Sequence, residues 1–293
     1  MRKKFSVCLI LICLIGCFDS IDTDIIQQVE KIDTGMVLIP AGEVTIGLSQ
    51  KQFERHKQQY PPAIPVTIEW YTVQRKTYLP AALPLQTVYV DAFYMDTHEV
   101  TWGQYLDFMD ASGYESKSVT TRIHDWGWGI DSIDRELPIS QLTIADMKAY
   151  AEWHNKEIPT EIEWEKAARG GLTDMNYPWG NTIEPTHANY NHAGFLNAFS
   201  AEDGTRVLSP VAGGQYPPNG YGLFDMSGNV SEYVTTEWDS SSEIEISVVI
   251  ARGGNYRHSG FYQQNWYRKR RVTGPGHNFV GFRCIKRINS PVP

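Results

Sequence analysis

The chain has 293 residues, a formal net charge of −8, and 24 Gly, 16 Tyr, 9 Trp and 4 Cys. An acidic surface repels phosphate backbones and anionic headgroups, which excludes nucleic acid as a partner and a polybasic route to the membrane. Many aromatic residues and glycines beside few helix signals predict a loop-rich fold that aromatic packing holds together.

The first seventeen residues have the layout of an export signal. Three basic residues follow Met1, and the apolar stretch 5–16 is shorter than a membrane-spanning helix requires. The stretch ends in Leu14-Ile15-Gly16-Cys17, which resembles the bacterial lipobox, where the cysteine is lipidated and becomes the first mature residue. We therefore expect a signal peptide at 1–16 and a lipidated Cys17 with a polar tether at 17–34. An uncleaved anchor helix, the alternative, would need a longer apolar run.

Cysteine usage limits the chemistry that the chain can carry out. Cys8 and Cys13 would leave with the signal and Cys17 would carry lipid, so Cys284 would remain alone. The mature chain would then have no internal disulfide and no site built from two thiolates. Without residues 1–16 the formal net charge moves from −8 to −11, because only three basic residues are lost.

We expect one folded domain at 35–290, with an insertion at 50–84. Its opening motif, "MVLIPAGEVTIG" (36–47), has β-branched residues around a Pro-Ala-Gly turn and predicts a strand hairpin. The insertion is rich in charge and proline, and we expect at most a short strand there, at 66–71. The residues 86–101 alternate as in a strand, after which Thr101 can cap a helix that runs through Met109.

Two later helices carry stronger start signals. Thr143 with Asp146 opens "IADMKAYAEWHN", and Thr160 with Glu163 opens "EIEWEKAARGG", which ends at two glycines. The apolar positions of the second helix predict one buried face. For about a hundred residues beyond it, glycine, asparagine, proline and aromatic residues replace regular periodicity.

Eight stretches, in order, resemble landmarks of the formylglycine-generating enzyme family, also called sulfatase-modifying factors. They are "MVLIPAGEVTIG", "YMDTHEVTWGQYLDFM", "PISQLTIADMKAYAEW", "IPTEIEWEKAARGG", "YPWGN", "SPVAGGQYPPNGYGLFDMSGNVSEY", "RGGNY" and "VGFRC". The resemblance implies a single α+β domain with little regular secondary structure, the formylglycine-generating-enzyme fold, which is related to C-type lectin folds.

The resemblance also implies two calcium sites, whose spacing this chain keeps. The positions of the first site are Asn189, Tyr190, Asp203 and Thr205, and those of the second are Asp225, Met226, Gly228, Val230 and Glu232. Carboxylates, amide oxygens and carbonyls in a glycine-rich loop suit calcium. The alternative is that Asp203 and Asp225 only cap turns. The tryptophans usual at the second site are replaced by Ser231 and Tyr233.

In catalytic members two cysteines bind Cu(I) and bring O2 to a substrate cysteine, and the resemblance places His258 and Gln263 at those positions. Soft thiolates suit Cu(I), so copper is not expected here. A redox centre built from His258, His277 and His192 is conceivable, but their spacing does not require it. Cys284 cannot replace the pair, because the resemblance assigns it to the core.

These observations favour an exported lipoprotein of the outer membrane, on its periplasmic or surface face, with a non-catalytic binding or scaffold domain. Family lipoproteins in gliding-motility and type IX secretion machinery make an envelope protein or an exported protein the expected partner. Two alternatives remain open. One is an oxidoreductase that forms formylglycine on an exported sulfatase-like protein through a non-thiolate metal site, and the other is a lectin-like ligand-binding module.

Overall fold

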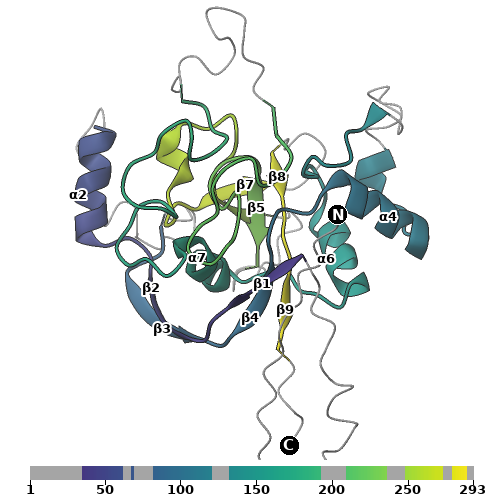
Figure 1. The fold of residues 1–293 in the computed structure, drawn as a ribbon, viewed down its shortest axis with the longest axis horizontal. Helices are drawn as coiled ribbons and strands as arrows, with labels where there is room; N and C mark the ends of the chain where they lie inside the picture. Colours follow the sequence, from purple (N-terminus) through teal and green to yellow (C-terminus); the bar gives the residue numbers. More distant parts are fainter. Residues whose placement is uncertain are drawn as a thin grey trace, which may run out of the picture. The chain divides into compact units, whose positions relative to one another are not determined.

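The computed structural model describes residues 35–61, 67–68, 82–120, 132–192, 209–235, 248–272 and 279–288, without the side chains of 248–249 and 270–272. These residues lie within one unit, Gly35–Pro293. Three small sheets form its middle, with α2 at one edge and the pair α4 and α6 at the opposite edge (Figure 1). The predicted α+β domain with short regular elements is confirmed. Cys17, the signal peptide and the tether lie outside the described residues.

The opening motif does form two strands, but the predicted hairpin is wrong. Strand β1 (Met36–Ile39) pairs with β4 (Phe93–Asp96), whereas β2 (Gly42–Ile46) pairs with β3 (Gln86–Val90) in a separate sheet. The predicted long strand at 86–101 is likewise two strands, one in each sheet. Each strand therefore finds its partner about fifty residues away along the chain rather than across its adjacent turn.

The end of the chain completes two of the sheets. Strand β9 (Ile285–Arg287) pairs antiparallel with β4, which gives the order β1-β4-β9. Strand β8 (Val280–Gly281) pairs parallel with β5 (Ser231–Val234), in a sheet of order β7-β6-β5-β8. The other two strands of that sheet are β6 (Val248–Arg252) and β7 (Lys269–Val272). Residues far apart in the sequence are thereby brought to one side of the domain.

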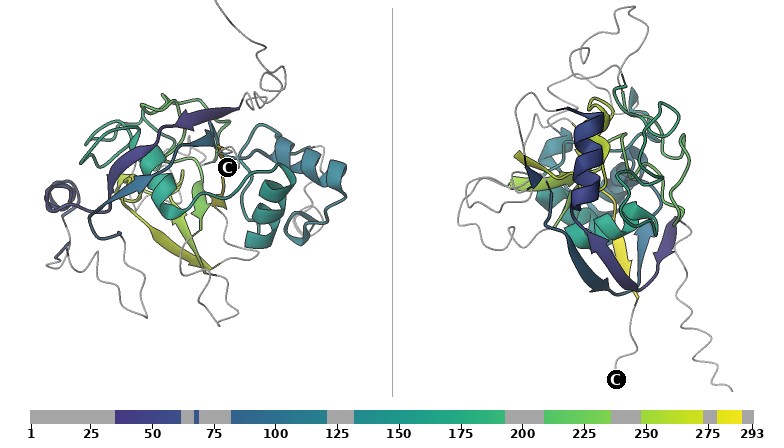
Figure 2. Two further views of the ribbon diagram at one scale, coloured as in Figure 1. Left: turned by 90° about the horizontal axis from the view of Figure 1, so that it is seen from below. Right: turned by 90° about the vertical axis from the view of Figure 1, so that its left-hand side faces the viewer.

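Helices α4 (Trp102–Ser112) and α6 (Ile144–Trp153) begin at the predicted caps. The side chains of Thr101 and Thr143 each accept the N–H of the third helical residue, so each helix has a capping box at its amino end. Helix α4 runs one turn beyond the predicted end and stops at Gly113, which takes the left-handed conformation. The two helices lie side by side (Figure 2) and contribute aromatic side chains to one core cluster.

The expectation of no helix in the insertion 50–84 is wrong. Helix α2 (Gln50–Gln59) begins at Ser49, whose side chain and that of Gln52 form a capping box. Phe53 and His56, three residues apart, turn inward and are buried. The expected strand at 66–71 falls almost entirely outside the described residues.

Helix α7 (Glu161–Arg169) has the predicted capping box at Thr160 and ends at Gly170 in the left-handed conformation. The prediction of a single buried face is wrong, because charged residues of the other faces are buried as well. Among the described residues after α7, no helix or strand occurs between Gly171 and β5. No helix of the described part combines the length and apolar character that crossing a bilayer requires.

Candidate functional site

The loop after β6 lies against the loop of the second predicted calcium site. Gly253 accepts the N–H of Gly228 at 2.9 Å, and the N–H of Tyr256 donates to the carbonyl of Asn229 at 3.0 Å. Gly253 and Gly254 both have positive φ, 81° and 70°, which side chains disfavour. A Cβ on Gly253 would also crowd Trp164 at 3.2 Å. Glycine is therefore required for this close approach.

Gln263, which the resemblance places at the second copper cysteine, holds this loop together through its side-chain amide. It ends a short 3-10 helix, η4 (Gly260–Gln263), and its side chain is fully buried. Its amide nitrogen donates to the carbonyls of Asn255 and His258, each at 3.1 Å. Its amide oxygen has no hydrogen-bond partner among the described residues. The side chain fills the space next to Gly254, so its role is structural.

His258, which the resemblance places at the first copper cysteine, contacts the ammonium group of Lys269. Its Nε2 lies 3.1 Å from Nζ of Lys269, and its ring lies 4.8 Å from the ring of Tyr262. The same ammonium group stands over the Tyr262 ring at 4.9 Å from its centroid. A positive charge in contact with the imidazole opposes binding of a metal cation there.

Of the other histidines proposed for a redox centre, the structure describes only His192. The backbone N–H of its neighbour Asn191 donates to the carbonyl of His258 at 3.0 Å. His192 is exposed and contacts the ring of Tyr190 at 6.2 Å, and His277 lies outside the described residues. Within the described ranges no three His, Cys, Asp or Glu side chains converge as a metal site. Cys284 is buried as a free thiol, and burial raises the pKa of this thiol well above its ordinary value.

The second predicted calcium loop contains unsatisfied buried oxygens. Asp225 has φ 56°, and its Oδ2 accepts the N–H of Gly214 at 3.0 Å, while its Oδ1 has no partner in the described part. Oε1 of the buried Glu99 is likewise without a partner among the described residues. Burial, reinforced by the charge of Asp225, raises the pKa of Glu99 well above its ordinary value. Burial also raises the pKa of Asp225.

Glu232, the last residue predicted for that site, is held by donors of the protein. Its carboxylate accepts two hydrogen bonds from Arg283, both at 2.8 Å, and one from Nε1 of Trp164 at 2.7 Å. Arg283 also donates to backbone carbonyls of three other residues, Asp96, Thr97 and Phe224. The carboxylate of Glu232 is therefore saturated by protein donors, and it contributes charge to the cluster at a distance.

The first predicted calcium loop lies beside the second. Nδ2 of Asn189 donates to the carbonyl of Ser209 and to Oδ1 of Asn229, and its own carbonyl accepts the N–H of Asn229. A Cβ on Gly228 would collide with the Asn189 backbone, and this glycine has φ 93°. Asp203 and Thr205, which complete the predicted ligand set, lie outside the described residues.

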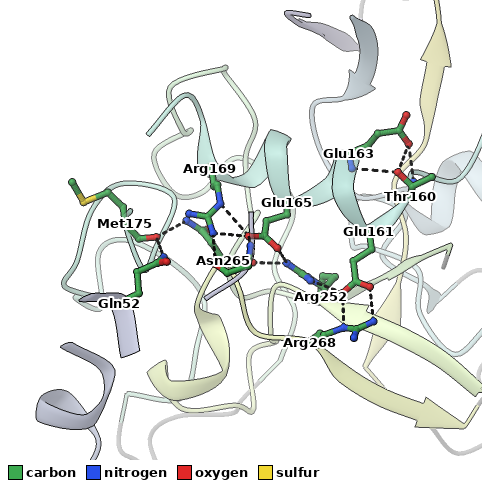
Figure 3. Close-up of polar contacts among 11 residues, drawn as sticks. Gln52, Thr160, Glu161, Glu163, Glu165, Arg169, Met175, Arg252, Asn265 and Arg268 are labelled. Atoms are coloured by element: carbon green, nitrogen blue, oxygen red, sulfur yellow. Dashed lines mark hydrogen bonds and ion pairs between the residues drawn. The ribbon is translucent and has the colours of Figure 1, made fainter. Parts of the chain in front are cut away.

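The sequence reasoning missed a buried ion-pair network on α7 (Figure 3). Glu161 pairs with Arg252 at 2.6 Å and with Arg268 at 2.6 Å, and Glu165 pairs with Arg252 at 2.7 Å and with Arg169 at 2.5 Å. All five side chains are buried. Burial opposes ionisation of Glu165, but the charges of Arg169 and Arg252 hold its pKa below the ordinary value. The spacing of 161, 165 and 169 by four was the available signal.

This network joins three distant segments to α7. Arg169 donates to the carbonyl of Gly47 at 3.0 Å, and Glu165 accepts the N–H of the same glycine at 2.7 Å. Arg268 belongs to the run "YRKRR", and its burial on Glu161 makes it structural rather than part of an exposed anion-binding patch. The network therefore fixes the frame against which the loop after β6 is placed.

Comparison with known proteins gives a consistent family. Residues 23–288 match the family model described as "Sulfatase-modifying factor enzyme 1-like domain". The chain is 28% identical over 303 residues to the formylglycine-generating enzyme of Mus musculus, covering 86% of this chain and 74% of that relative. It is 35% identical over 163 residues to the inactive C-alpha-formylglycine-generating enzyme 2 of Bos taurus, covering 53% of this chain and 52% of that relative. PvdO from Pseudomonas aeruginosa has the same fold, with a TM-score of 0.57, 20% identity, and coverage of 86% and 94%.

Proposed function

Because the chain belongs to the sulfatase-modifying factor enzyme 1-like family, we propose that it is a cell-envelope lipoprotein whose domain serves as a binding or scaffold module without thiol oxidase chemistry. The observation that carries this proposal is the loop after β6. The buried amide of Gln263 donates to two backbone carbonyls there, and His258 contacts Lys269. A relative that matches about half of this chain is named as an inactive enzyme, which agrees with loss of catalysis in the family.

Copper chemistry needs ligands that this loop does not supply. Cu(I) prefers thiolates, and an amide turned to two backbone carbonyls offers no replacement. The ammonium group beside His258 adds repulsion toward any cation at the remaining position. The described residues therefore fit a structural loop better than a copper site.

The decisive experiment is an oxidation assay on the full-length protein. We would incubate it with a cysteine-containing sulfatase peptide, copper and O2, and measure aldehyde by mass spectrometry. No aldehyde is expected. Aldehyde that disappears in the His258→Ala variant would establish the oxidoreductase alternative with a non-thiolate site. The Lys269→Ala variant is the matched test, because it removes only the repelling charge.

We propose that calcium binds the loop that contains Asp225. The unpartnered oxygens of Asp225 and Glu99 are hard anionic ligands, and the loop offers the carbonyls of Met226, Gly228 and Val230. Glu99 is an addition to the set that the sequence suggested. Bound calcium would offset the repulsion between the buried carboxylates, so its role is structural.

Calcium binding is measured by unfolding the protein in calcium and in EGTA. A ligand of the native state stabilises it by about 2.7 kcal/mol at a hundredfold excess over Kd. Asp225→Asn should reduce this calcium effect, whereas Asp174→Asn, at a surface turn paired with Lys51, should leave it intact. Equal unfolding free energies with calcium and with EGTA would contradict the proposal.

The lipid anchor at Cys17 and the outer-membrane location form the remaining part of the proposal. They are supported by the basic start, the short apolar stretch and the lipobox-like ending. A role in gliding or type IX secretion machinery, with an envelope or exported protein as partner, is consistent with such an anchor. Mass spectrometry of the native protein tests it, because an unmodified Cys17 would contradict lipidation.

A further inference from the structure

A surface pocket of about 790 Å³ opens beside the end of α4, far along the chain from the loops considered above. We call it the α4 pocket. Its apolar lining comes from Leu106, Met109, Tyr114 and Ile133, which are partly buried against the main core. Because these side chains are anchored in the core, the pocket has a firm apolar floor that a ligand side chain could cover.

The rim of the α4 pocket is negative. Asp107, Asp110 and Glu115 are exposed on it, and Arg135 is the basic residue among the described residues that line the pocket. The guanidinium of Arg135 pairs with Asp107 and donates to the carbonyl of Gly103 at 3.2 Å. Arg135 therefore offsets the charge of Asp107, and the carboxylates of Asp110 and Glu115 give the rim its negative charge.

The end of α4 adds to this negative potential. The carboxyl end of a helix carries a partial negative charge, which a basic residue in the last turn usually offsets. Helix α4 has no basic residue in its last turn, and Gly113 at its cap lines the pocket. The carboxyl end of the helix and the two carboxylates together favour a positively charged group. The apolar floor favours a ligand that also carries an apolar group next to that charge.

We propose that the α4 pocket binds a short basic and apolar segment of a partner polypeptide. A Lys or Arg side chain would approach Asp110 and Glu115, and an adjacent apolar side chain would pack on Met109 and Ile133. A bare metal ion fits less well, since no three ligand side chains converge within the described residues. This inference is independent of calcium, of lipidation and of the loop after β6.

The test uses the full-length protein in a non-ionic detergent and fluorescein-labelled eight-residue peptides. Alternating Arg-Leu is the probe, alternating Glu-Leu controls for charge, and alternating Arg-Ser controls for apolar contact. Fluorescence anisotropy at low salt should show saturable one-to-one binding of the Arg-Leu peptide. The two control peptides should bind at least about tenfold more weakly.

Variants then locate the binding. Asp110→Asn with Glu115→Gln should weaken Arg-Leu binding about tenfold, and Met109→Lys should abolish it. Glu152→Gln with Glu54→Gln, which removes exposed carboxylates on α6 and α2, is the matched control and should change nothing. Equal loss in both double variants, absence of saturable binding, or equally tight Glu-Leu binding would each overturn the proposal. None of these outcomes depends on the oxidation assay.

Discussion

Two groups of buried charges lie on either side of Trp164, and they differ in how they are balanced. In the α7 network the two carboxylates, Glu161 and Glu165, meet three arginines. In the loop cluster three carboxylates, Glu99, Asp225 and Glu232, share the single guanidinium of Arg283. Nε1 of Trp164 donates to Glu232, and its ring lies 5.2 Å from Arg252.

The difference indicates that the α7 network is purely structural, whereas the loop cluster is a candidate binding site for a cation. Every carboxylate of the α7 network has a positive partner, so the network needs nothing from solution. The loop cluster leaves two carboxylate oxygens without hydrogen-bond partners among the described residues, which costs free energy unless another positive charge arrives. One domain thus uses the same residue types for support and for a candidate ion site.

The largest effect is expected from removing the central cation of the α7 network. Arg252→Met should break the buried pairs with Glu161 and Glu165, leave each carboxylate with one arginine, and lower the free energy of unfolding by about 3 to 5 kcal/mol. Urea denaturation in the presence of calcium measures the loss. A loss of less than about 1 kcal/mol would show that the network does not hold the frame.

Acid should destabilise the protein through a buried histidine, His56, that is neutral in the folded state. His56 accepts the amide of Gln264 at 2.8 Å, and burial lowers its pKa from 6.5 to about 4. Below pH 6.5 the unfolded chain takes up this proton first, so stability falls as the pH drops from 6.5 to about 4. The loss approaches about 3 kcal/mol. His56→Gln keeps an acceptor and should flatten that part of the pH profile, and an unchanged slope would contradict this assignment.

In the loop cluster, replacing an acid by an amide should stabilise the protein when calcium is absent. Burial first and the charge of Asp225 second disfavour an ionised Glu99, so Glu99→Gln should raise the free energy of unfolding in EGTA by about 1 to 2 kcal/mol. The same variant should respond less to calcium. Chemical denaturation in both buffers tests the comparison directly. Destabilisation in EGTA would mean that this cluster is as complete as the α7 network.

The smallest effect is expected at the outer edge of α7, where Arg287 contacts Glu157 and Glu163. This arginine is 43% exposed, so solvent screens its pairs. Arg287→Gln should cost less than about 1 kcal/mol, which provides the exposed control for Arg252→Met. A cost as large as that of Arg252→Met would remove the contrast between buried and exposed pairs.

The sequence predicted those features of the fold that depend on neighbouring residues. The caps at Thr101, Thr143 and Thr160 were found because a capping box lies within four residues. The same signature at Ser49 was overlooked because charge and proline dominate the stretch that follows. The hairpin was wrong because strand partners are chosen by long-range packing, which turn residues at Pro40-Ala41 do not encode.

For the candidate site, the positions of individual residues were predictable, but the contacts between them were not. The resemblance placed His258 and Gln263 on one loop and assigned Asn189 and Asp225 to two calcium sites. It gave no indication that Lys269 contacts His258 or that Arg283 pairs with Glu232, because these contacts join segments that are separate in the sequence. Glu99 was missed because it lies far from the loop in the sequence and stands in the polar stretch "YMDTHEVT", which does not mark it as buried.

The sheet of order β1-β4-β9 has a consequence for shortening the chain. Its third strand, Ile285–Arg287, pairs with β4, which also pairs with β1, and Arg283 just before that strand pairs with Glu232. Removing residues 284–287 would leave the backbone groups of β4 on that side without partners, so the shortened chain should unfold at a lower denaturant concentration than the intact one.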